Sequence, residues 1–565
     1  MNSPQFGLYL ELLRSPMLPS KRNSDVLRQE QPAGQLADAP NDLTLHRGWL
    51  GPWICAAALF VLRIILLPLN TDFSSAVTHD SAYIAIVARN LLSGKGWVND
   101  ASWLVFLHPA RLPMPYHNAN PLYPLLTAVA AKVLGLPVVR AGLLVSALAS
   151  VGLFLASFYL ASYWMKSDWS VLLIALAVTV FPPLWQCSLR MLPDALTLTL
   201  LIAGLAFFVR AERYPLCIAA GIVFGAAWLT RSTASLIAPA LVVYAFAAWT
   251  WPKAILRLTL AGVAALVVAA PWLIHTAHVW GSPLRSDATY YAFQDFYARP
   301  YGGSIDRYWR SPELPPPPMQ LIRSNGAGAI LTHVVTGIPR VIMGWFRDGW
   351  ERRYVPRIVL LVLLASVALR FRRHFLTPAF FASVVYAGLQ IVVMALRSDS
   401  FEPRYLAPLT ALMVLWLGCG IATLLAGQGL RGPARYALIL GTMFLACYMP
   451  VQDAILVRQN AEDSPVANRR RVRRSISAEI THLDPVVVFD PYFYTLDTGA
   501  QALSITQSSD DYLLHYMEQY NARWIILSDG DVSFWRPQWR VELPPWLKVR
   551  GKFDGNTLFE RVSPS

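Results

Sequence analysis

Apolar runs of roughly 20 residues recur along the chain, separated by short polar connections. A helix of that length crosses about 30 Å of hydrocarbon, so the pattern predicts an all-α polytopic membrane protein. Eleven spans are predicted, near residues 50–69, 138–163, 169–187, 194–210, 215–231, 233–250, 255–274, 356–370, 377–396, 406–426 and 435–451. An odd number of spans places the two termini on opposite sides of the membrane.

Basic residues orient these spans. They gather in alternate connections, as at Arg370, Arg372 and Arg373, and in the polar segment 1–48. Cytoplasmic loops carry such an excess, so we expect 1–48 to be a cytoplasmic tail and 49–452 the transmembrane domain. The segments expected to face outward are 70–137, 275–355, 397–405 and the tail 453–565. This arrangement predicts a multi-pass protein of the cell inner membrane with a periplasmic C-terminus.

Composition agrees with a membrane protein. Hydrophobic residues make up 55% of the 565 residues and charged residues only 15%, against about 25% in soluble domains. The net charge of +14 follows largely from the cytoplasmic bias of Lys and Arg. We therefore expect a lipid bilayer as the surroundings and no nucleic-acid partner.

The tail 453–565 has a different pattern. Residues 485–490, 523–528 and 557–562 are typical of buried strands, and 512–520 of a helix. This order predicts a small α/β domain. It contains no phosphate-binding loop, metal cluster or Ser/His/Asp spacing, so we interpret it as an accessory or acceptor-binding domain.

The most informative position is Asp80, which follows the first apolar span and opens a helix predicted over 80–93. Gly94 is suited to end that helix with a positive φ. Ionisable groups at a membrane are costly and usually functional, which favours Asp80 as a catalytic base. Asp is also a good helix N-cap, and that alternative stays open.

Three motifs carry a resemblance to a known family. They are Asp80 to Gly94 with Tyr83 inside it, Asn120-Pro121-Leu122-Tyr123-Pro124, and Glu402-Pro403-Arg404-Tyr405-Leu406-Ala407-Pro408. Looser matches are Leu192-Pro193-Asp194 and Leu229-Thr230-Arg231. Over residues 48–452 the chain resembles the GT-C glycosyltransferases, and most of all the bacterial branch with protein O-mannosyltransferase-like enzymes and lipid A aminoarabinose transferases.

The resemblance implies transfer of a sugar, with inversion, from a polyprenyl-phosphate donor to a hydroxyl of a glycan, lipid or protein acceptor on the outer face. Asp80 would be the base, and cationic groups such as Arg404 and Arg231 would meet the phosphate. The substrate-binding residues that it implies are His79, Tyr83, Arg190, Asp194, Arg231, Glu402, Arg404 and Tyr405. Arg190 and Asp194 could instead pair at i and i+4, and Arg404 with Glu402 could form a structural ion pair.

One departure concerns a metal. Many relatives have two adjacent acids where this chain has His79-Asp80. The missing carboxylate puts a paired-acid metal site in doubt, and a divalent ion held by Asp80 and His79 stays an open possibility. A solvated or structural His79 is the simpler alternative.

Other functions are open at this point. An O-antigen ligase or polymerase acting on polyprenyl-diphosphate glycans would use a large late outer loop, and 275–355 is such a loop. A transporter would need charges buried inside spans or paired broken helices, and neither is evident. A membrane scaffold without activity is the remaining alternative.

Overall fold

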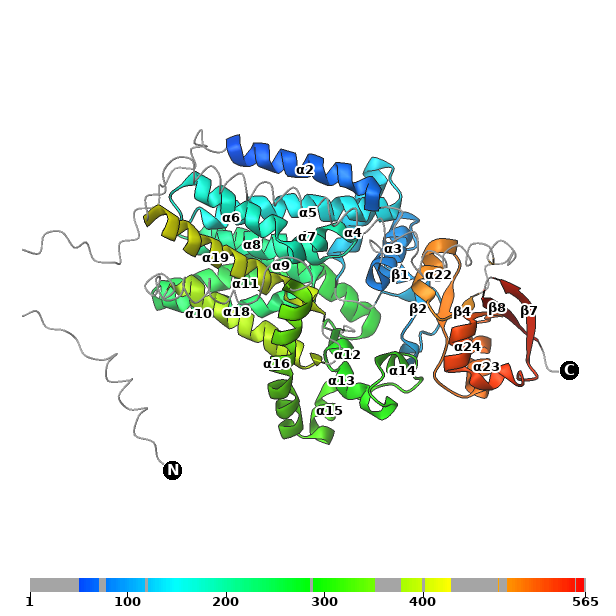
Figure 1. Ribbon diagram of the computed structural model, residues 1–565. Helices are drawn as coiled ribbons and strands as arrows, with labels where there is room; N and C mark the ends of the chain where they lie inside the picture. Colours follow the sequence, from blue (N-terminus) through cyan, green and yellow to red (C-terminus); the bar gives the residue numbers. More distant parts are fainter. Residues whose placement is uncertain are drawn as a thin grey trace, which may run out of the picture. The chain divides into compact units, whose positions relative to one another are not determined.

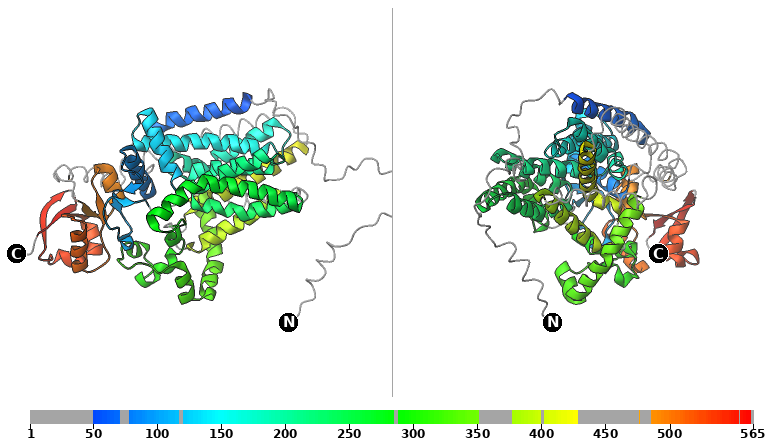
Figure 2. Two further views of the ribbon diagram at one scale, coloured as in Figure 1. Left: turned by 180° about the vertical axis from the view of Figure 1, so that it is seen from behind. Right: turned by 60° about the vertical axis from the view of Figure 1, so that its left-hand side comes forward.

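The computed structural model describes residues 50–70, 78–116, 120–284, 288–350, 377–398, 402–427, 476, 485–553 and 555–562, all within one unit, Leu50–Ser565. Most of the helices run side by side in one bundle (Figures 1 and 2). Its members are α2 (Leu50–Asn70), α5 (Val138–Ala161), α6 (Asp168–Val180), α7 (Pro182–Leu189), α8 (Asp194–Val209), α9 (Tyr214–Thr230), α10 (Ile237–Ala248), α11 (Trp251–Trp280), α18 (Pro378–Ala395) and α19 (Ala407–Gly427).

The bundle agrees with the predicted spans wherever the structure describes them. Each such span coincides with one helix or with a broken pair, while those predicted near 356–370 and 435–451 lie outside the described residues. By length and composition, five described helices can cross a membrane alone. The span predicted over 169–187 is broken between α6 and α7, which meet at a 61° bend. Pro182 and Pro183 lie at this break. They explain it, because proline removes a helix hydrogen bond and clashes with the preceding turn.

One candidate span was not predicted. Residues Ala327–Trp345 of α16 (Ala327–Trp350) are long and apolar enough to cross a membrane, yet they belong to the segment 275–355 that we assigned to the outer face. Polar residues such as Thr332 and His333 interrupt the apolar run, so this helix did not stand out in the sequence. The outward placement of this whole segment therefore stays a prediction.

Small residues allow α9 and α11 to pack closely. A Cβ added at Gly221 would lie 2.2 Å from the carbonyl oxygen of Ala261, and one at Gly225 would lie 2.7 Å from that of Ala265. Small residues four positions apart let two membrane helices approach until their backbones touch. This contact holds the end of α9, which carries Arg231, against the long helix α11.

We keep the names first and second outer segment for 70–137 and 275–355, which the sequence predicts to face outward. The first of them contains α3 (His79–Leu92), β1 (Val98–Asn99), β2 (Ala101–Ser102), η2 (Val105–Leu107), β3 (Met114–Pro115) and α4 (Leu122–Leu134). The predicted helix over 80–93 is confirmed as α3. Its N-cap is Thr78, whose side chain accepts a hydrogen bond from the backbone N–H of Ser81. It ends before Gly94, which has a φ of 76° as expected.

The second outer segment is a series of short helices rather than an unstructured loop. They are α12 (Ala288–Ala292), α13 (Gln294–Tyr297), η4 (Arg299–Tyr301), α14 (Ile305–Trp309) and α15 (Pro318–Asn325). Buried Phe296, Tyr297 and Tyr308 join the aromatic core that surrounds α3. The aromatic residues of this segment are therefore largely packing residues of one apolar cluster.

The last part of the chain contains β4 (Val486–Val488), α22 (Pro491–Thr498), β5 (Ala502–Ser504), α23 (Asp510–Gln519), β6 (Trp524–Ser528), α24 (Asp529–Trp535), η7 (Pro537–Arg540), β7 (Leu547–Phe553) and β8 (Asn556–Arg561). The strands predicted at 485–490, 523–528 and 557–562 are present as β4, β6 and β8. The helix predicted at 512–520 is present as α23.

These strands form one mixed sheet in the order β2-β5-β4-β6-β8-β7. The first four are parallel, and β8 and β7 are antiparallel to their neighbours. The edge strand β2 comes from the first outer segment, where Ala101 pairs with Ala502. The sequence did not predict this strand, because two residues are too few for a periodic pattern. The C-terminal sheet is thus completed by a segment that follows α3 (Figure 1).

Replacement of Gly221 by Val should destabilise the helix bundle, because the added atoms would overlap the α11 backbone. Overpacking of this kind costs about 1–3 kcal/mol. The measurement is thermal unfolding of purified variants in detergent. Gly262→Val is the matched control, since a Cβ there meets nothing within 4 Å. Equal melting temperatures for the two variants would contradict the close contact.

Candidate active site

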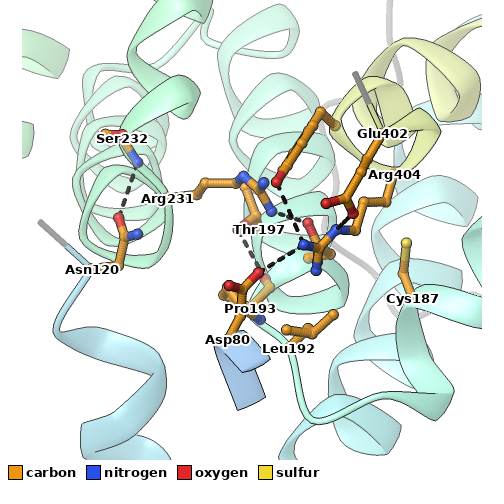
Figure 3. A network of polar contacts seen from close by, with 12 residues as sticks. Asp80, Asn120, Cys187, Leu192, Pro193, Thr197, Arg231, Ser232, Glu402 and Arg404 are labelled. Carbon is orange, nitrogen blue, oxygen red and sulfur yellow. Dashed lines mark hydrogen bonds and ion pairs between the residues drawn. The ribbon is translucent and has the colours of Figure 1, made fainter. Parts of the chain in front are cut away.

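The ends of four bundle or outer elements meet at one polar cluster (Figure 3). Asp80 lies in the first turn of α3 and Asp194 in the first turn of α8. Arg231 follows α9, and Arg404 lies in η6 (Pro403–Leu406), just before α19. Residues far apart in the sequence are therefore brought together where these helices begin or end.

Asp80 and Arg404 form the central ion pair. Arg404 Nη2 donates to Asp80 Oδ2 at 2.7 Å, and Arg404 Nε donates to Glu402 Oε2 at 2.6 Å. The side chain of Asp80 is 56% exposed, whereas that of Arg404 is only 14% exposed. The carboxylate is thus accessible to a small molecule, while the guanidinium is held in place by protein.

A second ion pair lies beside the first. Arg231 Nη1 donates to Asp194 Oδ1, and the Asp194 side chain is only 4% exposed. The alternative pairing of Asp194 with Arg190 is wrong, because the α8 carboxylate is directed towards the end of α9 instead. Arg190 follows α7 and is half-buried, and the described part of the chain provides it with no ion pair.

Tyr405 lies among three guanidinium groups. The Cζ atoms of Arg231, Arg397 and Arg404 are 4.8, 4.7 and 5.2 Å from the centre of its ring. Cations over an aromatic face are attracted by the ring quadrupole. Arg397 was missed in the sequence analysis, although it directly follows the apolar run 377–396 in the outer segment 397–405.

The turn that follows Arg231 is held by the second motif. Asn120 Oδ1 accepts a hydrogen bond of 3.1 Å from the backbone N–H of Ser232, and Tyr123 donates to the Gly142 carbonyl at 2.8 Å. Asn120 thereby caps η3 (Ser232–Leu236), directly after Arg231. We interpret this motif as one that positions the arginine.

The charges around Asp80 determine its ionisation. Although its side chain is 56% exposed, the protein around Asp80 replaces part of its water and opposes ionisation. The guanidinium of Arg404, its hydrogen bond, Arg231 and His79 together nevertheless lower the pKa of Asp80 below its ordinary value. The carboxylate is therefore charged at neutral pH. A carboxylate held this way is also a weak base, because its guanidinium partner stabilises the charged form.

Two tyrosines that were not among the expected substrate-binding residues, Tyr291 and Tyr492, interact electrostatically with Asp80. Burial raises the pKa of Tyr291 and of Tyr492, and the negative charge of Asp80 raises both further. Both phenols are therefore neutral hydrogen-bond donors. Tyr83, which was expected to bind substrate, lies beside them, since its ring centre is 5.1 Å from that of Tyr492. Tyr492 comes from α22, a part of the chain that no local pattern connects to Asp80.

The residues present do not fit a resident divalent ion. Asp80 pairs with Arg404, whereas His79 Nε2 lies 3.2 Å from Asp490 Oδ2. Over the described ranges, no group of three or more His, Cys, Asp or Glu side chains is placed to hold a metal. The two ligands suggested by the sequence thus have different partners.

Comparisons with known proteins identify the fold. No family model matches the chain, and no curated protein matches its sequence. Among solved structures, ArnT from Cupriavidus metallidurans bound to undecaprenyl phosphate matches with a TM-score of 0.56 and 15% identity, covering 91% of this chain and 98% of that chain. The oligosaccharyltransferase AglB from Archaeoglobus fulgidus, in complex with an inhibitory peptide and a dolichol-phosphate, matches with a TM-score of 0.52 and 13% identity, covering 85% and 69%.

The fold is that of the GT-C glycosyltransferases. The expected fold class is therefore correct in its main part, a helical membrane protein of GT-C type. At these identities the likeness concerns the GT-C fold, and the activity has to be argued from the site.

Removal of Arg231 should destabilise the protein strongly. In Arg231→Met the buried carboxylate of Asp194 loses its partner, and breaking a buried pair costs about 3–5 kcal/mol. The double variant Arg231→Met/Asp194→Leu should recover much of this loss, because no unpaired charge remains. Unfolding in detergent measures both variants. A neutral effect of Arg231→Met alone would contradict the buried pair.

Proposed function

We propose that this protein is an integral-membrane, inverting glycosyltransferase. It would move a sugar from a polyprenyl-phosphate carrier to the hydroxyl of an envelope lipid, glycan or protein, on the outer face of the cell inner membrane. The observation that carries the proposal is the accessible carboxylate of Asp80, directly beside the guanidinium groups that surround Tyr405.

The guanidinium groups suit a phosphate leaving group. Arg binds phosphate through paired N–H donors, and positioned cations stabilise the charge that develops as the lipid phosphate departs. The neighbours that carry undecaprenyl phosphate and dolichol-phosphate support this assignment. Arg404 is the best placed, since its largely enclosed guanidinium already binds an anionic group.

The contacts of Arg404 imply that donor and base compete for it. Asp80 and Glu402 both accept hydrogen bonds from Arg404, so a phosphate that binds this guanidinium would have to displace a carboxylate from it. Asp80 is the most exposed member of the two ion pairs at the centre. When Arg404 turns to the phosphate, the pKa of Asp80 rises again and Asp80 becomes a better base.

Asp80 would then accept the proton of the acceptor hydroxyl while this oxygen attacks the anomeric carbon and the phosphate leaves. The neutral phenols of Tyr291 and Tyr492 are available to donate hydrogen bonds to sugar hydroxyls near Asp80. No step passes through a metal, because the donor set does not fit one.

The first test is Asp80→Asn in cells that lack the native protein, followed by mass spectrometry of envelope lipids and glycans. The asparagine cannot take the proton, so the lost envelope sugar should stay absent and the polyprenyl-phosphate sugar should accumulate. Asp511→Asn, an exposed acid at the start of α23, should restore the sugar. Full activity of Asp80→Asn would overturn the assignment of the base.

The same analysis separates the alternative enzymes. An intact glycan accumulating on polyprenyl diphosphate would indicate a ligase.

Because Asp80 competes with phosphate for Arg404, purified Asp80→Asn should also bind undecaprenyl phosphate at least as tightly as the native protein. Weaker binding would contradict this competition.

Arg404→Gln should change the pH dependence of the residual activity. The base must be charged, and Arg404 lowers the pKa of Asp80, so the native enzyme retains kcat/KM well into the acidic range. Without the guanidinium the pKa of Asp80 rises, and kcat/KM should be lost at a higher pH as the solution is acidified. An unchanged acidic limb in the pH profile would show that Asp80 is not the titrating base.

A further inference from the structure

The C-terminal sheet presents the carboxyl ends of β4 and β5 to the segment around α3. In chain order β4, β5 and β6 follow one another, but in the sheet β4 lies between the other two. The connections from β4 and β5 therefore run in opposite directions, which makes the carboxyl end of β4 a topological switch point. In open α/β sheets this is the place where ligands bind.

Here that edge is occupied by the protein itself. Arg310, which follows α14 and is fully buried, donates to the hydroxyl of Ser504 at the end of β5 and to the carbonyl of Phe489, just after β4, at 2.9 Å. The next residue, Asp490, is the N-cap of α22 and has its carboxylate against His79. The edge therefore holds an arginine from the second outer segment and a histidine from α3.

Three contacts align α22 with α3. His79 Nε2 lies 3.2 Å from Asp490 Oδ2, the rings of Tyr83 and Tyr492 are 5.1 Å apart, and Arg89 donates to the Thr495 carbonyl at 3.1 Å. These contacts follow α3 from its first turn to its last. Through α22, the last part of the chain (485–562, called the C-terminal unit below) thus packs along the helix that carries Asp80, as the adjacent ribbons of α3 and α22 show (Figure 1).

The His79 ring lies in a defined contact. Its Nε2 is 3.2 Å from a carboxylate oxygen of Asp490, whose side chain is 7% exposed. A carboxylate only accepts hydrogen bonds, so this contact favours the tautomer with the hydrogen on Nε2. Trp103 packs against the ring edge-on, with centroids 3.8 Å apart, and the Phe493 ring centre is 5.2 Å away. His79 is the residue directly before Asp80, so its orientation constrains the backbone that aims the catalytic carboxylate.

We propose that Asp490 is a positioning residue for catalysis: by accepting the hydrogen bond of His79, it holds the first turn of α3 so that Asp80 points at the reacting groups. This inference rests on the proposed function, in which Asp80 accepts the proton. The first turn of a helix has unsatisfied N–H groups and frays readily. The Thr78 cap is the local restraint on this turn, and the contact with Asp490 adds a restraint from a distant part of the fold.

The test compares variants that keep and remove the hydrogen-bond acceptor. Asp490→Asn retains an oxygen that can accept from Nε2–H, whereas Asp490→Leu has a similar size and retains none. Small misplacements of a reacting group cost up to about 10²-fold in rate. We expect Asp490→Leu to restore the envelope sugar about 10- to 100-fold more slowly per inserted protein, and Asp490→Asn to keep most of the native rate.

Binding of undecaprenyl phosphate, measured by its thermal shift, should be unchanged in both variants, because the phosphate is expected at the arginines around Tyr405, whereas the carboxylate of Asp490 lies against His79. His79→Phe keeps the ring among the aromatic residues and removes the hydrogen bond. It should slow transfer to a similar extent, and combining it with Asp490→Leu should add little. Asp511→Asn is again the control.

A native rate for Asp490→Leu would overturn the inference. If that variant does not fold, as an absent thermal shift would reveal, a native rate for His79→Phe would overturn it instead. Failure of the proposed function gives a different result, because the native protein would then transfer no sugar or Asp80→Asn would be fully active.

Discussion

The ion pair between Asp80 and Arg404 is the interaction on which the site depends. Charges enclosed by protein are costly unless they are compensated. Here the compensation comes from residues 324 positions apart in the chain, so the site exists only when α3 and the start of α19 are correctly packed. The neighbouring pair of Asp194 and Arg231 joins α8 and α9 in the same way.

The packing of the bundle helices determines where Arg231 lies in the site. Gly221 and Gly225 allow α9 to approach the α11 backbone, and Arg231 stands immediately after α9. Asn120 then holds the following turn. The position of one phosphate-binding candidate is therefore determined by small residues inside the bundle and by an amide from the first outer segment.

The C-terminal unit is continuous with the site rather than appended to it. It takes β2 from the segment after α3, surrounds Arg310 from the second outer segment, and contacts His79 through Asp490. The buried guanidinium of Arg310 is stabilised here by hydrogen bonds and by the aromatic faces of Trp103 and Phe489. Three segments distant in sequence thus stabilise one another, and α3 lies at their junction.

The amino-acid sequence by itself predicted most of the described bundle helices and singled out Asp80, because hydropathy and the cost of an ionisable group beside a span are local properties, but it did not predict the candidate span in α16. It also identified Arg404, Glu402 and Tyr405 through a continuous motif. It did not reveal that Asp194 pairs with Arg231 rather than Arg190, since the partner depends on how α8 crosses α9. Asp490, Tyr492 and the strand β2 carry no local signal either. Only the tertiary structure decided these, because contacts between residues hundreds of positions apart arise from packing and not from sequence periodicity.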